Sequence, residues 1–236
     1  MYISACVELE LISIIVLDKY LENPAIEITF ANGLTRMHID ELLYFKDFDL
    51  PDYLKLFYEQ TNGLMIDSEY LSDDLGDAVH LKINACEDLF FTTKKVNFLP
   101  NHRFIQFAGN EEEAFYLLDT KNLDPNGNPL ILLSMPADRF CIPLTNSFDV
   151  LLECSCLGFL GYLEQFGSEE SRRDHLSKKM LREKEAIKHC LKDLFVTAKR
   201  EYELLDIWRL DDKVKKIIQA STVKWFKEIK RLLTII

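Results

Sequence analysis

The sequence lacks the cysteine, glycine and proline patterns that mark several classes of protein. None of its six cysteines forms a C-x-x-C pair, so neither a zinc framework nor a dense disulfide scaffold is indicated, and we expect reduced, mostly buried thiols. The 8 glycines and 7 prolines among 236 residues are too few for a collagen-like or linker-dominated chain. The hydrophobic share of 48% is enough to build a core, which excludes wholesale disorder.

The sequence also lacks a segment that indicates a membrane span or secretion. An apolar run at residues 11–17, interrupted by Ser13, is about one third of the ~20 residues that a bilayer-spanning helix needs. Acidic residues flank this run, whereas a signal peptide begins with a positively charged segment. We therefore expect a soluble, cytoplasmic protein without a membrane partner.

The sequence contains fewer basic than acidic residues: 28 Lys and Arg and 39 Asp and Glu give a net charge of -11. Phosphate recognition depends on cationic side chains, so this balance argues against direct nucleic-acid binding. The acidity is uneven: residues 1–167 hold 10 basic and 27 acidic residues, whereas residues 168–236 hold 18 and 12. We therefore divide the chain into an acidic domain, residues 1–167 with an N-terminal extension at 1–37, and a basic extension, residues 168–236.

The basic extension has the periodicity of amphipathic helices. It contains no glycine or proline, and its apolar residues recur three or four positions apart on both sides of a break at residues 210–212, where an Asp can cap the second helix. Three interpretations are open: the helices pack on the acidic domain, they form a homodimer or bind a partner helix, or they contact a membrane or nucleic acid. Acidic residues within the extension reduce its positive charge, which disfavours contact with a membrane or nucleic acid. The opposite charges of the two regions favour packing of the extension on the acidic domain, either of its own chain or of a neighbouring molecule.

The sequence of the acidic domain predicts short strands and helices. Residues 7–21 fit a helix or a strand equally. A strand at Ile26–Phe30 runs into a turn at Asn32-Gly33, and it could form a hairpin with residues 37–39. Strands are predicted at Ile26–Phe30, 103–107, 114–118, 130–133 and 140–142, with a turn at Asn126-Gly127 before the fourth of them.

Two helices are predicted in the same domain. The first occupies residues 50–63, since Pro51 suits a helix start and Asn62-Gly63 a helix end. The second follows the capping residues Asn146 and Ser147 and continues to Leu163. The order of elements predicts an α+β fold with a largely antiparallel, twisted sheet flanked by helices.

Four motifs in the domain stand in an order that resembles a known family. They are Leu50-Pro51-Asp52-Tyr53 with Asn62-Gly63, Phe104–Gly109, Tyr116-Leu117-Leu118-Asp119, and Asn146-Ser147-Phe148 with Leu151-Leu152. Over roughly residues 38–166 the chain thus resembles the SUKH superfamily, which includes a yeast cell-wall synthesis regulator and many bacterial immunity proteins. It departs from the family at Glu111-Glu112-Glu113, in place of a glycine-rich, aspartate-containing turn, and at Leu64, in place of a small residue.

The resemblance implies a SUKH-like fold that binds another protein without a catalytic residue or a cofactor. We therefore expect an immunity protein that neutralises a cationic toxin domain by stoichiometric binding. Many such toxins are nucleases, which present cationic surface to a phosphate backbone, and an acidic inhibitor can occupy that surface. The alternatives are an intracellular regulatory scaffold of signalling or cell-envelope synthesis, and an unrecognised hydrolase or nucleotide-binding enzyme.

Two acidic clusters are the candidate partner-binding surface. Solvated surface loops are the more common explanation, since exposed charges need no partner, and a calcium site is disfavoured because the spacing does not match an EF-hand loop. Their residues are Asp67, Glu69, Asp73, Asp74 and Asp77 after the first helix, and Glu111, Glu112 and Glu113 in a strand turn.

Nothing in the sequence indicates catalysis or a metal centre. Cys154 and Cys156 point about 200° apart on the predicted helix, so they are expected in the core rather than on one metal ion. The five histidines are dispersed, and no Walker, G-x-S-x-G or H-E-x-x-H pattern occurs.

Overall fold

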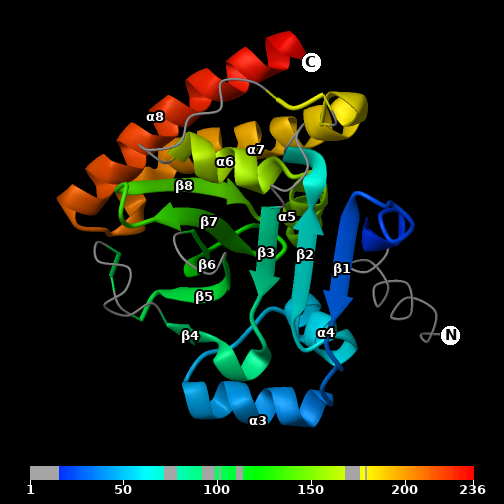
Figure 1. Ribbon diagram of the computed structural model, residues 1–236. Helices are drawn as coiled ribbons and strands as arrows, with labels where there is room; N and C mark the ends of the chain where they lie inside the picture. Colours follow the sequence, from blue (N-terminus) through cyan, green and yellow to red (C-terminus); the bar gives the residue numbers. More distant parts are fainter. Residues whose placement is uncertain are drawn as a thin grey trace, which may run out of the picture.

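The computed structural model describes residues 16–71, 79–91, 99–100, 102–109, 114–167, 176–178 and 180–236. In this part of the chain, eight strands form one open sheet with helices packed around it (Figure 1). The strands follow the order β1-β2-β3-β5-β6-β7-β8, β4 pairs with β5, and every pairing is antiparallel. The predicted α+β fold with a largely antiparallel sheet is therefore confirmed.

Five of the strands coincide closely with predicted ones, namely β1 and β5 to β8, whereas β2, β3 and β4 were not predicted. The bounds are β1 (Ile26–Phe30), β2 (Leu64–Ser68), β3 (Val79–Ile83), β4 (Phe90–Phe91), β5 (Phe104–Gly109), β6 (Phe115–Leu123), β7 (Pro129–Met135) and β8 (Phe140–Thr145). The helices are α3 (Arg36–Lys46), α4 (Asp52–Gln60), α5 (Phe148–Cys156), α6 (Phe159–Gly167), α7 (Lys184–Leu204) and α8 (Asp212–Ile235). Short 3₁₀ helices stand at η1 (Glu69–Leu71), η2 (Cys86–Asp88), η3 (Met180–Glu183) and η4 (Leu205–Trp208).

The hairpin considered between β1 and residues 37–39 is wrong. Residues 37–39 belong to the first turn of α3, where the hydroxyl of Thr35 accepts a hydrogen bond from the backbone N–H of His38 at 3.3 Å. This N-cap starts a helix directly after the turn, and β1 pairs with β2 instead. Of residues 7–21, those at 16–18 are helical, and residues 7–15 lie outside the described part.

The helix predicted at residues 50–63 is α4, with Pro51 one position earlier than expected, as its N-cap. The predicted face is buried, since Leu54, Phe57, Tyr58 and Thr61 are each 1% exposed. Gly63 has φ of +112° and allows the chain to turn from α4 into β2, a backbone conformation that other residues rarely adopt.

The single helix predicted from residue 148 to 163 is instead two helices, α5 and α6. Ser147 caps α5 as predicted, because its hydroxyl accepts the backbone N–H of Val150 at 3.3 Å. Gly158 then adopts a left-handed conformation with φ of +68°, which ends α5 and redirects the chain into α6.

The C-terminal helices α7 and α8 pack on the sheet, as the first of the three interpretations expects. Asp211 caps α8 at the predicted break by accepting the backbone N–H of Lys213 at 2.8 Å. Both helices contact β8 and each other (Figure 1). Trp225, Ile229 and Leu232 are fully buried in the same hydrophobic core as the sheet.

The sheet has a hydrophobic core on each of its faces around β7, which is buried along its whole length. The larger core lies between the sheet, α4 to α7 and the second half of α8. A smaller one gathers Leu117, Leu130 and Leu132 of the sheet with Trp208 and Val214 from η4 and α8. None of the helices in the described part of the chain combines the length and apolarity that a membrane span requires.

Candidate functional site

Two residues of the predicted acidic surface lie in the described part of the chain. Asp67 lies on the outer face of β2, directly opposite Glu27 of β1, while the alternate residues of β2 are buried. Glu69 is exposed at the start of η1. Asp73, Asp74 and Asp77, together with Glu111, Glu112 and Glu113, lie outside the described residues.

Helix α3 exposes large apolar side chains that the sequence analysis did not single out. Only Ile39 and Leu43 of this helix are buried, whereas Tyr44 and Phe45 are each 83% exposed and Met37 is 71% exposed. The two aromatic rings contact each other edge to face, with centroids 5.9 Å apart. We call this the α3 surface; its residues recur along one side of the helix and are Arg36, Met37, Asp40, Glu41, Tyr44 and Phe45.

Contacts at both ends of α3 hold this surface in place. At the start of the helix, the guanidinium of Arg36 bonds Asp52 at 2.6 Å and Glu59 at 3.1 Å, both on α4. At its end, Nζ of Lys46 donates to the backbone carbonyls of Glu87 at 2.7 Å and Leu89 at 2.8 Å. A partner would therefore meet a surface that is already ordered, which lowers the entropic cost of binding.

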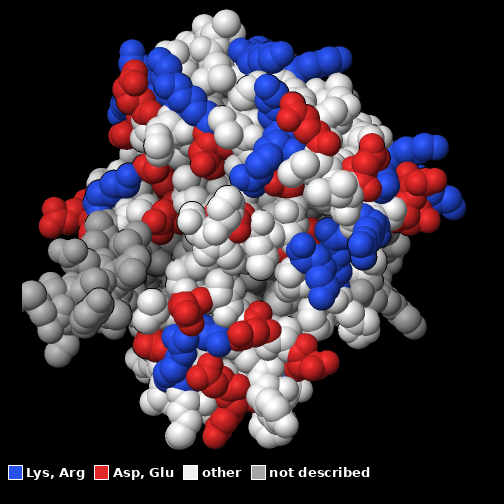
Figure 2. Space-filling view, turned by 180° about the vertical axis from the view of Figure 1, so that it is seen from behind, with Lys and Arg blue, Asp and Glu red and all other residues white. Residues whose placement is uncertain are grey.

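The surroundings of the α3 surface are acidic. Residues 36–60 contain six Asp and Glu against three Lys and Arg, and the ammonium of Lys55 is paired with Asp40 at 3.3 Å and Asp49 at 2.6 Å. Figure 2 shows acidic side chains around the few basic ones at the α3 end of the molecule, while Lys and Arg gather toward the opposite end, formed by α7 and α8. The apolar centre of the α3 surface thus has an acidic rim.

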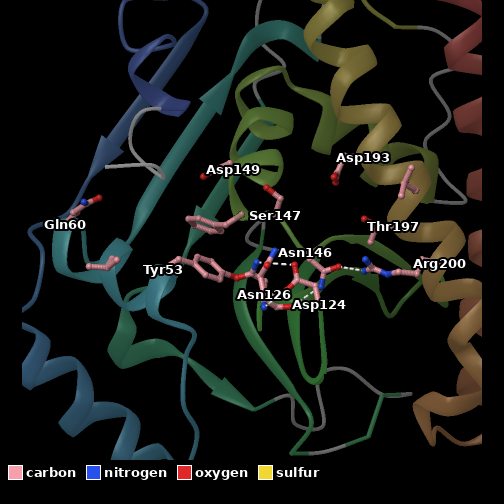
Figure 3. Close-up of a pocket in the computed structure, with 14 residues that line it drawn as sticks. Tyr53, Gln60, Asp124, Asn126, Asn146, Ser147, Asp149, Asp193, Thr197 and Arg200 are labelled. Atoms are coloured by element: carbon pink, nitrogen blue, oxygen red, sulfur yellow. Dashed lines mark hydrogen bonds between the residues drawn. The ribbon is translucent and has the colours of Figure 1, made fainter. Parts of the chain in front are cut away.

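A polar cavity of about 480 Å³ lies on the other side of α4. Its walls come from α4, the turn between β6 and β7, the start of α5 and the middle of α7 (Figure 3). Most of the lining residues carry a carboxylate, an amide or a hydroxyl, and Arg200 is the one cation among those described.

Hydrogen bonds join the walls of the cavity to one another. In the β6–β7 turn, Oδ1 of Asp124 accepts the backbone N–H groups of Asn126 and Asn128, both at 2.8 Å. The side-chain amide of Asn146 donates to the carbonyl of Asn128 at 3.0 Å and accepts from Arg200 of α7. The turn, the β8–α5 junction and α7 are therefore fixed relative to each other.

Two ionisable groups of the cavity have shifted pKa values. Burial, and then the negative charge of Glu153, raise the pKa of the Asp149 carboxyl. Burial, with the charges of Asp124 and Asp149, raises the pKa of the Tyr53 hydroxyl well above its usual range, so this group is a neutral phenol. Its oxygen is buried and has no hydrogen-bond partner in the described part of the chain.

No protein-family model and no curated protein matches this chain. The resemblance to the SUKH superfamily therefore stands on its motifs alone. The motifs fall on the kinds of element expected for them: the first on α4, the second on β5, the third on β6, and the fourth at the start of α5. This agreement concerns the individual elements, and membership of the family stays a prediction.

The cysteines that the structure describes are buried and carry no disulfide, as expected. Cys154 lies beside Cys190 of α7, and this contact together with burial raises the pKa of the Cys154 thiol. Burial also raises the pKa of Cys156, to about 12, and both Cys154 and Cys156 lie in the hydrophobic core, where the sequence places them. No group of three or more metal-ligating side chains occurs among the residues described.

Proposed function

We propose that the chain is a non-enzymatic module that binds one cationic protein partner in the cytoplasm, in the manner of an immunity protein with its toxin. The observation that supports this most is the α3 surface, an ordered apolar centre with an acidic rim. Contiguous exposed apolar side chains on a soluble protein mark interaction sites. Met, Tyr, Phe and Arg, which make up most of this surface, are enriched in protein interfaces.

The charge distribution favours a cationic partner at this surface. The acidic rim would attract a basic partner from a distance and accelerate its association, while the apolar centre would supply most of the affinity. A toxin domain that contacts a phosphate backbone must carry such a basic surface, and a module seated on it would block access of the substrate. The resemblance to immunity proteins supports this function over a regulatory scaffold.

Replacing both Tyr44 and Phe45 with alanine should weaken partner binding by about 30-fold or more, since aromatic side chains at the centre of an interface are frequent hot spots. The free energy of unfolding should change by less than about 0.5 kcal/mol, because both side chains are largely exposed. The control is Ile207→Ala in η4, which removes a similarly exposed apolar side chain (69%) from an element outside the α3 surface. The partner is first captured from host lysate, identified and purified, and each variant is then titrated against it by calorimetry.

The identity of the partner and the behaviour of the variant decide the proposal together. A basic toxin whose action on cells is relieved by the wild type and not by the double variant would support it. Equal binding by the double variant would remove the α3 surface from the interface and overturn the proposal. A resident envelope or signalling protein as partner, with the chain needed in the absence of any toxin, would favour the scaffold.

A further inference from the structure

The buried hydroxyl of Tyr53 is the starting point for a second site. It points into the polar cavity toward the β6–β7 turn (Figure 3) and meets no partner among the described residues. A buried hydroxyl without a hydrogen bond costs free energy, so such a group in a native structure calls for an explanation. A ligand in the cavity would supply the missing hydrogen bond.

The positive features of the cavity are already engaged within the chain. The backbone N–H of Val150 at the start of α5 is capped by Ser147. The guanidinium of Arg200 donates to Asn146 and to Oε1 of the buried Glu201, the latter at 2.6 Å. An anionic ligand would therefore find few donors here and would face several carboxylates.

The carboxylates of the cavity favour the opposite charge. Asp149 and Asp193 lie on opposite sides of Ser147 (Figure 3). Asp193 receives the hydroxyl of Thr145 at 2.7 Å, and no cation of the described chain pairs with Asp149. With Asp124 these groups give three carboxylates against one guanidinium, so the cavity has a net negative charge that a bound cation would offset.

We propose that this cavity binds an organic cation through its ammonium or guanidinium groups, with Asp149 and Asp193 as counter-charges on its two sides and the hydroxyl of Tyr53 as an acceptor beside the β6–β7 turn. The volume of about 480 Å³ falls within the range of roughly 300–1,000 Å³ found for small-ligand sites. A multiple N–H donor suits this lining, since carboxylates only accept hydrogen bonds and the phenol oxygen can accept one more. None of these residues belongs to the α3 surface, so the inference stands or falls independently of the proposed function.

Two sources present the same chemistry, a free polyamine and a basic side chain of another protein. The full-length chain is therefore titrated by calorimetry at low ionic strength with spermidine and, separately, with the blocked tripeptide acetyl-Gly-Arg-Gly-amide. Glycerol serves as the neutral probe and citrate as the anionic one. Saturable binding of spermidine or of the tripeptide, with neither glycerol nor citrate bound, is the expected result, and the tighter of the two cations identifies the source.

Two variants test whether the cation sits in this cavity. Tyr53→Phe should weaken binding about tenfold, the effect of one hydrogen bond to a charged group, without lowering the melting temperature, because the hydroxyl has no partner to lose. Asp149→Asn should weaken it at least as much. The controls are Tyr44→Phe on the α3 surface and Asp212→Asn, which removes the corresponding first-turn carboxylate of α8.

The proposal fails if neither cation binds, if glycerol or citrate binds as well as the cations do, or if Tyr53→Phe binds them as tightly as the wild type. Equal losses in the control variants would also overturn it, since they would place the cation on the general acidic surface. If Asp149→Asn does not fold, Tyr53→Phe alone decides. The Tyr44→Ala and Phe45→Ala double variant should bind spermidine like the wild type, which keeps this test separate from that of the proposed function.

Discussion

Replacing Trp225 with alanine should lower the free energy of unfolding by about 3–5 kcal/mol, the usual cost of emptying a large buried aromatic site. Trp225 is fully buried, and its ring lies against the rings of Phe166 and Phe159, with centroids 5.9 and 6.4 Å away. The loss of stability has two parts: the free energy gained by moving the side chain from water into the core, and the cost of the cavity that its removal leaves. Urea denaturation followed by circular dichroism measures it.

The control is Val223→Ala, two residues earlier on the more exposed side of α8, where the side chain is 39% exposed. This change should cost less than about 0.5 kcal/mol, as expected for a surface position. Trp225→Phe should retain much of the stability, because the indole nitrogen has no hydrogen-bond partner among the described residues. A Trp225→Ala protein as stable as the wild type would mean that α8 is a free tail in solution.

The basic extension has one buried apolar side and one exposed basic side. The apolar faces of α7 and α8 are largely buried in the core against the sheet, so these faces are not available for a partner helix or a second copy of the chain. Their basic side chains remain at the end of the molecule opposite the α3 surface (Figure 2). The charge asymmetry seen along the sequence thus becomes an asymmetry between the two ends of the fold.

The parts of the fold that the sequence predicts well are those set by local hydrogen bonding. Ser147 and Asp211 cap helices, and Gly127 forms the turn expected at Asn126-Gly127 with φ of +84°. Each of these depends on a side chain and a few neighbouring backbone groups, so no knowledge of the tertiary structure is needed.

The wrong or missing predictions concern long-range contacts. A turn at Asn32-Gly33 is compatible with a hairpin, but only the tertiary structure pairs β1 with β2, a strand whose start lies more than thirty residues further along. In β2 the outer face carries Met65 as well as Asp67, which hides the alternation of a strand. In β3, by contrast, Val79, Leu81 and Ile83 alternate with polar residues, so this strand was missed although its sequence carries the signal of a strand.

The candidate sites illustrate the same limit. Tyr53 and Ser147 were noted only as motif or capping residues and Asn126 only as part of a turn, and nothing in the sequence places them around one cavity with α7. The α3 surface had a better signal. Thr35 is a good N-cap, and Ile39 and Leu43 are four residues apart, so a helix could have been predicted there with Met37, Tyr44 and Phe45 off its apolar face.

Arg103 and Asp119 form a second point on which the stability of the fold depends. Asp119 belongs to the third of the SUKH-like motifs and is fully buried. Its carboxylate receives Nε and Nη2 of Arg103 at 2.8 and 2.6 Å and the backbone N–H of Lys121 at 3.0 Å. Arg103 also donates to the carbonyl of Trp208, which ties the β5–β6 pair to η4.

Arg103→Met should therefore destabilise the protein by about 3–5 kcal/mol, because it leaves a buried carboxylate without its counter-charge. The double variant Arg103→Met with Asp119→Leu should be more stable than Arg103→Met alone, since it removes the uncompensated charge as well. Arg36→Met is the control, because its partners Asp40, Asp52 and Glu59 are 52%, 84% and 30% exposed and exposed ion pairs contribute about 0–1 kcal/mol each. Arg103→Met, Asp119→Leu and their double variant form a double-mutant cycle with the wild type, and urea denaturation curves of these proteins and of Arg36→Met give the free energies of unfolding.

The outcome of this cycle separates two roles for Asp119. If Asp119 serves only to hold Arg103 and η4, the apolar double variant should keep the sheet and the helices in place and should bind the partner as the wild type does. A double variant that folds and yet loses the partner would give Asp119 a role in recognition, although the residue lies in the sheet interior, away from the α3 surface.

If Arg103→Met were as stable as the wild type, the buried ion pair would not contribute to docking the C-terminal helices on the sheet. The apolar contacts of Trp208 and Val214 in the smaller core would then hold that end of the extension alone.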